Sequence, residues 1–234
     1  MRLMQNAVEH SRLVVGVIAG TPIDTKFGVN FLLEKQIKAF GLSISETPQE
    51  QTELQALNRD ALTHKVEQVI EQLKLSGVNA IMIYCNSLSG AIDLEAIRAH
   101  IDLPLICPLD VYRELIGKYR KFGLLAANCQ SCANIERLII ENDPRAKVIG
   151  VGNLQIVEDI EKGYAPRAII RDHALVEIAT SLRMSGVEIL ILACTHFHYF
   201  YQEFKGSVCL EIFEPSEQMV QRLLAMQTEL AAAA

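Results

Sequence analysis

The sequence predicts an α/β protein built from two similar halves, each with a parallel sheet that helices cover on both faces. The pattern LKLSGVNAIMIYCNS at 73–87 recurs as LRMSGVEILILACTH at 182–196. Two further landmarks recur at a spacing of 107 positions, a glycine inside an apolar run (Gly16, Gly123) and a proline that closes one (Pro108, Pro215). Short apolar runs that alternate with amphipathic stretches are typical of parallel sheets.

The first half begins with an apolar, β-branched run and contains a leucine-rich stretch with the spacing of an amphipathic helix, which ends at Gly77. The elements expected there are a strand at 13–19, a turn at 20–25, a helix at 30–40, a strand at 42–44, a polar loop at 45–51, a long helix at 52–76, a strand at 80–85, a helix at about 90–100 and a strand at 103–107.

The second half repeats this order. Its expected elements are a strand at 121–127, a helix at about 131–142, a strand at 148–151, a long helix at 167–185, a strand at 189–194 and a strand at 208–213. We therefore expect two Rossmann-like (flavodoxin-like) domains related by a pseudo-twofold axis, with the active site in the cleft between them. The first would comprise residues 1–108 plus 214–234, and the second residues 109–213.

Composition excludes several classes of protein. The net charge of −6 argues against a nucleic-acid partner, because phosphate binding requires a basic face. The longest apolar runs are far too short to span a bilayer, and residues 1–11 lack the apolar core of a secretion signal. We therefore expect a cytoplasmic protein with no membrane partner, whose six cysteines are reduced thiols rather than a disulfide framework.

Cys85 and Cys194 are the central candidates for chemistry, because each closes a predicted strand within the repeated pattern. Open α/β sheets bind ligands at the carboxyl ends of their strands. Two matched thiols on opposite walls of a cleft would suit a nearly symmetric reaction such as racemisation. In that reaction one group removes the α-proton and the other returns a proton to the opposite face. A single cysteine is more often a small buried apolar residue, so the prediction depends on the matched pair.

Polar residues follow both cysteines at expected helix starts, where backbone N–H groups favour a thiolate and can bind a carboxylate. Asn86 and Ser87 follow the first cysteine, and Thr195 and His196 follow the second. His196 could accept a proton from its cysteine or hold the charge of the thiolate. Asp24, in the turn after the first strand, is a candidate polar partner for the first cysteine.

The two cysteine motifs resemble those of the aspartate/glutamate racemase superfamily. Tyr84-Cys-Asn-Ser-Leu-Ser is similar to the Cys-Asn-Thr motif of that superfamily, and Leu192-Ala-Cys-Thr-His-Phe is similar to the Gly-Cys-Thr-His-Tyr motif of glutamate racemases. The resemblance covers nearly the whole chain. It implies an enzyme without a cofactor that uses one cysteine from each domain as a base. It further implies that Asn86, Ser87, Thr195 and His196 hold the substrate or tune the thiols, and that the protein forms a homodimer.

The chain departs from the pattern of glutamate racemases in its first turn, where Gly20-Thr-Pro-Ile-Asp-Thr stands in place of Asp-Ser-Gly. Thr21, Asp24 and Thr25 are the candidates to replace the missing groups. Arg59 is a candidate for a bidentate grip on a side-chain carboxylate, with a solvated helix arginine as the alternative. His196 resembles the glutamate type, whereas aspartate racemases have glutamate at that position. The substrate therefore stays open between aspartate, glutamate and another amino acid.

Three further motifs carry less information. Cys129-Gln-Ser-Cys132 lacks the second ligand pair of a zinc site, and the spacing alone does not establish a redox role. By its match to the first turn, this segment instead suggests Asn128 or Ser131 as substrate contacts. His196-Phe-His198 could bind a metal together with a carboxylate, but the other histidines are scattered along the sequence. We therefore expect no metal and interpret His198 as a structural residue. Gly150-Val-Gly152 lacks the spacing of a nucleotide loop.

The sequence thus predicts a racemase that inverts the α-carbon of an amino acid, aspartate or glutamate, without a cofactor. Cys85 and Cys194 would be the paired acid and base. The substrate-binding candidates are Thr21, Asp24, Arg59, Asn86, Ser87, Asn128, Thr195 and His196. Two alternatives remain: a cis–trans isomerase of a dicarboxylate, in which one cysteine would be a nucleophile, and an amino-acid sensor without catalysis.

Overall fold

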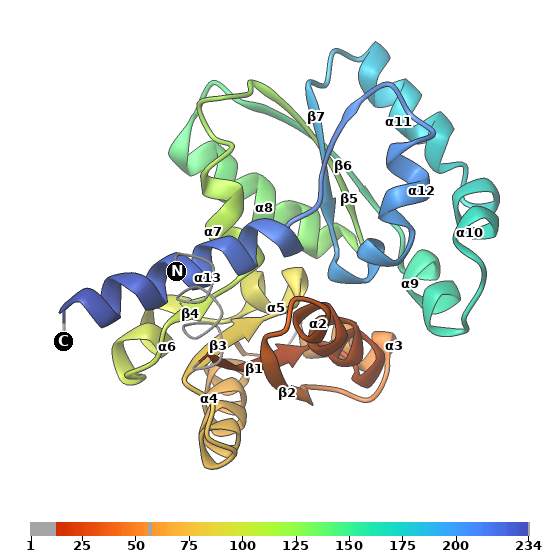
Figure 1. Ribbon diagram of the computed structural model, residues 1–234. Coiled ribbons are helices and arrows are strands. Elements are labelled where there is room, and N and C mark those ends of the chain that lie inside the picture. Colours follow the sequence, from red (N-terminus) through yellow and green to blue (C-terminus); the bar gives the residue numbers. More distant parts are fainter. Residues whose placement is uncertain (1–12, 56–57, 234) are drawn as a thin grey trace, which may run out of the picture. The chain divides into compact units, whose positions relative to one another are not determined.

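The computed structural model describes residues 13–55 and 58–233, with side chains placed as far as residue 229. The chain divides into two compact units (Figure 1). The first extends to Pro108 and takes in the chain again from Glu217, and the second covers Leu109–Ser216.

Each unit contains a four-stranded parallel sheet, and the two sheets share one topology. The strand order is β2-β1-β3-β4 in the first unit and β6-β5-β7-β8 in the second. The strands are β1 (Val14–Ala19), β2 (Lys38–Ser43), β3 (Ala80–Ile83), β4 (Leu105–Ile106), β5 (Lys121–Ala126), β6 (Lys147–Gly152), β7 (Ile189–Ala193) and β8 (Glu211–Phe213). The prediction of an α/β chain with two similar parallel-sheet domains is confirmed.

Helices connect the strands in both units. Those of the first unit are α2 (Pro22–Glu34), α3 (Pro48–Leu54), α4 (Arg59–Leu75), α5 (Asn86–Ala91), α6 (Leu94–His100) and nearly all of α13 (Ser216–Ala233), while α7 (Pro108–Arg113) begins at the boundary. Those of the second are α8 (Cys129–Asn142), α9 (Leu154–Glu161), α10 (Pro166–Asp172), α11 (Leu175–Met184), the 3₁₀ helix η1 (Thr195–Phe200) and α12 (Tyr201–Lys205).

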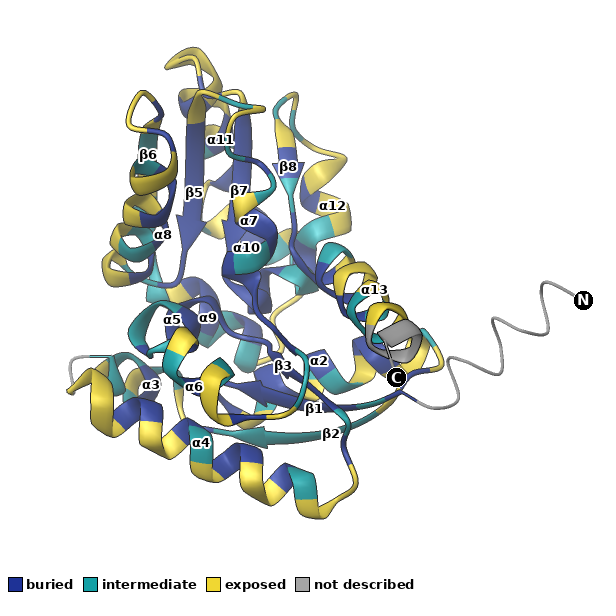
Figure 2. Ribbon diagram, turned by 90° about the vertical axis from the view of Figure 1, so that its left-hand side faces the viewer, coloured by how far each residue is buried: buried dark blue, intermediate teal, exposed yellow. Residues whose placement is uncertain are grey.

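The central strands form the core of each unit. Every residue of β3 and β7 is buried, and β1 and β5 are buried except for their first residues (Figure 2). In the second unit, α8 lies on one side of the sheet and α11 and α12 lie on the other (Figure 1). Because both faces of the central strands are covered, these strands are apolar runs without polar alternation. No helix of the described chain is both long enough and apolar enough to cross a membrane.

The first connection differs from the prediction of a turn at 20–25 and a helix at 30–40. Helix α2 begins at Pro22, and Thr21 caps it by accepting a hydrogen bond from the Asp24 N–H at 3.2 Å. Threonine followed by proline is a strong signal for a helix start. The helix ends at Glu34, so Phe40 lies in a strand and not in the predicted helix. This strand, β2, begins at Lys38, four residues before the strand predicted at 42–44.

The long helices predicted at 52–76 and 167–185 are each two helices. The predicted loop at 45–51 contains the start of α3, which Thr47 caps. In the second unit, α10 and α11 are separated at Ala174, which adopts a left-handed conformation with φ 50°. The helix predicted at about 90–100 is likewise divided into α5 and α6, while α7 and α9 were not predicted.

The glycines of Gly150-Val-Gly152 allow β6 to approach the start of α8. A Cβ atom on Gly150 would lie 2.9 Å from the Cys132 Cβ. A Cβ atom on Gly152 would lie 2.5 Å from the carbonyl carbon of Asn128 and 2.7 Å from the Cys129 nitrogen. Real Cβ atoms essentially never approach backbone so closely, so these glycines serve packing between the strand and the helix.

The Gly152→Ala substitution is expected to destabilise the protein by about 1–3 kcal/mol, because its new methyl group overpacks against the backbone of α8. Gly206→Ala is the matched control, since its nearest contact would be an ordinary 3.5 Å and its φ is −70°. The control should leave the unfolding midpoint in urea unchanged or slightly raised. Equal midpoints for the two variants would contradict the packing role.

Candidate active site

All predicted site residues except Arg59, together with Gln51 and Glu161, which were not predicted, fall into two sets, one in each unit. The Cys85 half-site, in the first unit, comprises Thr21, Asp24, Gln51, Cys85, Asn86 and Ser87. The Cys194 half-site, in the second unit, comprises Asn128, Glu161, Cys194, Thr195 and His196. Each half-site lies at the carboxyl edge of its own parallel sheet, where such sheets bind ligands.

The two cysteines occupy equivalent positions. Cys85 follows β3 and precedes α5, and Cys194 follows β7 and precedes η1. Their backbones are extended alike, with φ −164° and ψ 120° at Cys85 and φ −151° and ψ 129° at Cys194. Their exposed fractions are 5% and 7%, so both sulfurs are nearly shielded from solvent. The predicted repeat therefore extends to the conformation of the two thiol-bearing turns.

The Cys85 sulfur is contacted by two neutral hydrogen-bonding groups. Its Sγ atom lies 3.3 Å from Ser87 Oγ and 3.5 Å from Gln51 Nε2, which is a donor. Gln51 Nε2 also donates to Ser87 Oγ, so the amide, the hydroxyl and the sulfur form one buried cluster. Hydrogen bonds to sulfur from an amide and a hydroxyl stabilise the thiolate form without adding a charge.

The Cys194 sulfur is contacted by an ionisable chain. Its Sγ atom lies 3.7 Å from His196 Nδ1, and His196 Nε2 lies 2.9 Å from Glu161 Oε1. Glu161 is the last residue of α9, and its side chain is 13% exposed beside a histidine side chain that is 6% exposed. The carboxylate fixes the imidazole ring so that its other nitrogen faces the sulfur. This arrangement can accept a proton from the thiol or hold a charge opposite the thiolate.

Thr21 and Asn128 have the same structural role in the two units. Each caps the helix that follows the first strand of its sheet, Thr21 for α2 and Asn128 for α8. Asn128 Oδ1 accepts hydrogen bonds of 2.9 Å from both the backbone N–H and the hydroxyl of Ser131. Asp24, in the first turn of α2, is 1% exposed. Both segments thus place polar groups at the edge that carries the cysteine.

The remaining predicted residues divide into buried and exposed ones. Asn86 and Thr195 are 3% and 1% exposed, directly after the cysteines. Arg59, by contrast, is exposed at the start of α4, where its guanidinium donates to the Ile92 carbonyl at 3.1 Å. His198 lies 3.2 Å from the Glu214 carboxylate. The part of Arg59 in substrate binding stays a prediction.

Sequence reasoning missed two members of the half-sites, Gln51 and Glu161. Gln51 stands in a stretch that was predicted as a polar loop, and Glu161 stands in a segment to which no element had been assigned. Neither residue has a motif of its own. Gln51 reaches Cys85, and Glu161 reaches His196, from helices that are distant in sequence. The apolar spacing of Ile156, Val157 and Ile160 would have revealed α9 but not the role of the residue that ends it.

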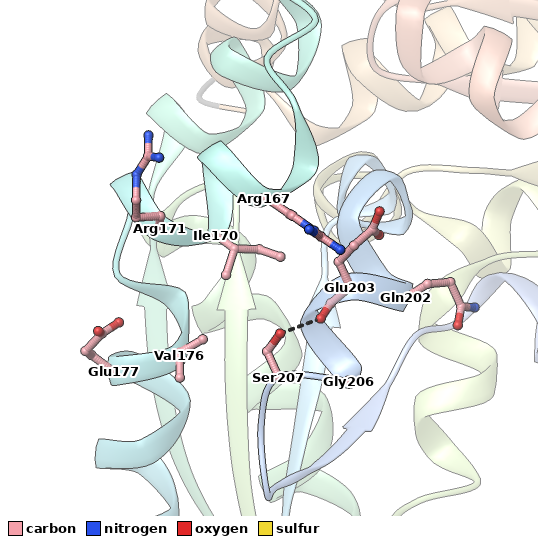
Figure 3. A pocket seen from close by; sticks show the side chains of 9 residues that line it. All are labelled: Arg167, Ile170, Arg171, Val176, Glu177, Gln202, Glu203, Gly206 and Ser207. Carbon is pink, nitrogen blue, oxygen red and sulfur yellow. Dashed lines mark hydrogen bonds between the residues drawn. The ribbon is translucent and has the colours of Figure 1, made fainter.

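The described residues contain no group of three or more His, Cys, Asp or Glu side chains arranged to hold a metal ion. A surface pocket of about 640 Å³ in the second unit is bordered by α10, α11 and α12 (Figure 3). Arg167, Arg171, Glu177 and Glu203 line it with both signs of charge, and no candidate site residue contributes to it.

Known proteins with similar sequences are racemases. The sequence model described as Asp/Glu/Hydantoin racemase matches residues 35–227. A glutamate racemase from Treponema pallidum is 23% identical over 153 residues, which are 62% of this chain and 56% of that protein. The match thus spans little more than half the length of the curated relative.

Solved structures with similar folds extend over nearly the whole chain. A glutamate racemase from Francisella tularensis, solved in complex with D-glutamate, has a TM-score of 0.73 at 19% identity and covers 94% of this chain and 82% of that one. An aspartate racemase homologue from Pyrococcus horikoshii has a TM-score of 0.63 at 18% identity and covers 92% and 98%. The chain thus shares the fold of these structures. The sequence match over residues 35–227 shows that it belongs to the Asp/Glu/hydantoin racemase family.

Proposed function

We propose that this protein is a cofactor-independent amino-acid racemase that inverts the α-carbon of aspartate or glutamate with Cys85 and Cys194 as paired acid and base. The observation that carries the proposal is the equivalence of the two half-sites. Each unit presents one nearly buried cysteine at the same strand end, in the same backbone conformation, with its sulfur in contact with the side chain two positions later. Family membership supports the same reaction.

The proposed reaction needs the two half-sites on opposite faces of one substrate. The thiolate of one cysteine removes the α-proton, and the thiol of the other delivers a proton to the opposite face. In the reverse direction the two sulfurs exchange roles, so their titrations are coupled. The substrate α-carboxylate would bind to backbone N–H groups and to the side chains of Asn86, Ser87 and Thr195, whose polarity suits a carboxylate.

The two thiols are not chemically equivalent in this proposal. Cys194 has a proton acceptor within reach in His196, which Glu161 holds in place. The Cys85 sulfur contacts the neutral amide of Gln51 and the hydroxyl of Ser87. Cys194 can therefore lose its proton to a side chain of its own unit, and the hydrogen bonds from Gln51 and Ser87 would stabilise a Cys85 thiolate.

The test of the function is incubation with each enantiomer of aspartate and glutamate in D₂O, followed by chiral chromatography and NMR of the α-position. A racemase forms the opposite enantiomer with deuterium on its α-carbon. A sensor without catalysis binds the amino acid but leaves both its configuration and its α-proton unchanged. A dicarboxylate isomerase leaves amino acids untouched and converts maleate to fumarate. Either of the last two outcomes would overturn the proposal.

The Gln51→Ala substitution is expected to reduce racemisation by about 10- to 100-fold, because a hydrogen bond to a charged group contributes roughly 1.5–3 kcal/mol. Gln51→Glu should reduce it further, since a carboxylate beside the sulfur opposes formation of the thiolate. The measurement is kcat/KM together with the rate of iodoacetamide alkylation of Cys85 as a function of pH. Alkylation should move to higher pH in both variants.

Gln49→Ala is the matched control for Gln51, because Gln49 is exposed on the same helix and donates only to Glu53 among the contacts described for it. This variant should retain the activity of the unmodified protein. If Gln51→Ala lowered the unfolding midpoint but left the alkylation profile of Cys85 in place, the amide would have a structural role alone.

A further inference from the structure

Cys129 and Cys132 form a pair that the proposed racemase chemistry does not use. They are the first and fourth residues of α8, a helix of 14 residues whose hydrogen-bonded first turn is capped by Asn128. Both are free thiols, Cys129 exposed and Cys132 partly buried. The first turn of a regular helix therefore fixes the relation between the two cysteines.

That relation suits a disulfide. Residues three apart in an α-helix have Cα atoms about 5 Å apart. Disulfides form between Cα atoms separated by roughly 4.4–6.8 Å. Residues at this spacing also project from the same face of the helix. The two sulfurs can therefore join through adjustments within one turn, without movement of the sheet or of another helix.

The environments of the two thiols differ in the way that an attacking and a resolving cysteine require. Exposure leaves Cys129 open to a reagent in solution. Cys132 lies against β6, where a Cβ atom on Gly150 would approach its sulfur to 3.0 Å. Burial, and then the neighbouring Cys129 and Glu136, raise the pKa of the Cys132 thiol to about 11. The Cys132 thiol therefore stays protonated and does not react before Cys129 has reacted.

The other four cysteines, all within the described part of the chain, lack this arrangement. Cys85, Cys107 and Cys194 are buried, and exposed Cys209 has no second cysteine near it in the sequence. In addition, the Cys132 side chain occupies the space that a side chain at Gly150 would take. The helical spacing, the difference in exposure and the contact of Cys132 with β6 therefore all single out Cys129 and Cys132.

We propose that Cys129 and Cys132 are a redox-active dithiol that reacts with a small-molecule disulfide of the glutathione class to form a reversible intramolecular disulfide. The Cys129 thiolate attacks one sulfur of the small disulfide and releases the other half as a thiolate. Cys132 then gives up its proton, attacks the Cys129 sulfur and releases the second half. The two cysteines lose two electrons and two protons in total, and the small disulfide gains them as two thiols.

The disulfide would form next to a predicted substrate contact. Asn128 directly precedes Cys129, and its backbone carbonyl accepts a hydrogen bond of 3.3 Å from the Cys132 N–H. Oxidation would therefore alter the turn that holds Asn128 at the edge of the second sheet. The redox chemistry itself is independent of whether the protein is a racemase.

The test is to equilibrate the full-length protein anaerobically with glutathione buffers of increasing oxidised-to-reduced ratio, alkylate the free thiols and map the peptides by mass spectrometry. The Cys129–Cys132 disulfide is expected to appear as the ratio rises and to disappear when reduced glutathione is restored. Cys209 is the internal control, because an exposed cysteine without a partner should carry only a mixed disulfide with glutathione.

Two variants separate the steps. Cys132→Ser should accumulate glutathione on Cys129, because the resolving thiol is gone, whereas Cys129→Ser should leave the partly buried Cys132 unmodified under the same conditions. If the unmodified protein instead carried glutathione on Cys129 to the extent seen in Cys132→Ser, or neither cysteine reacted, the proposal would be overturned. The unmodified protein alone decides the outcome if a variant fails to fold.

Discussion

Serine in place of Cys85 or Cys194 is expected to lower amino-acid racemisation by about 10²- to 10⁴-fold, the usual contribution of a positioned acid or base. A serine hydroxyl does not lose its proton at neutral pH without a strong base. The substituted residue can therefore no longer remove the α-proton from the face of the substrate that it contacts. Each substitution replaces a nearly buried sulfur with a smaller oxygen of similar geometry, so the unfolding midpoint should change little. Cys209→Ser is the control, because this exposed cysteine lies outside both half-sites.

The exchange of α-protons distinguishes two thiols from one. With a single thiol left, the enzyme can remove the α-proton of only one enantiomer and return a deuteron to the same face. Cys85→Ser and Cys194→Ser should therefore exchange opposite enantiomers with D₂O while neither forms the mirror image. NMR of the α-proton and chiral chromatography measure the two processes separately. Racemisation at full rate in either variant, or exchange of the same enantiomer by both, would refute the two-thiol mechanism.

The thiol-bearing turns could be predicted from the sequence because their information is local. Apolar runs that end at Cys85 and Cys194 predict buried strands, and a strand end in a parallel sheet already specifies an edge of that sheet. The repeat then implies that both cysteines share one backbone conformation, which their dihedral angles show. A pattern that is repeated within one chain needs no information about distant contacts.

The partners of the thiols could not be predicted because their information is tertiary. Gln51 reaches Cys85 from 34 positions away, and Glu161 reaches His196 from 35 positions away. Neither residue stands at a spacing that a motif would mark. The break at Ala174 was missed for a related reason, since the left-handed conformation falls on an alanine and no glycine or proline signals it.

Glu161→Gln is expected to lower racemisation by about 10²-fold, because it removes the charge that orients His196 toward the Cys194 sulfur. The amide can still occupy the space of the carboxylate, so the variant should fold. Glu158→Gln is the matched control on the same helix. The Glu158 side chain is 36% exposed and lies 3.8 Å from the Lys162 ammonium group. Because such exposed ion pairs contribute little, Glu158→Gln should leave the rate of racemisation almost unchanged.

A double-mutant cycle shows whether Glu161 acts through the imidazole. If it does, the variant with both Glu161→Gln and His196→Gln should be no slower than His196→Gln alone, because the carboxylate has nothing left to position. Additive losses would instead mean that Glu161 contacts the substrate or supports the fold independently. The cycle must be measured on kcat and KM separately, since an effect confined to KM would assign the carboxylate to substrate binding. A loss in kcat that vanishes in the His196→Gln background is the result that the observed Glu161–His196–Cys194 chain requires.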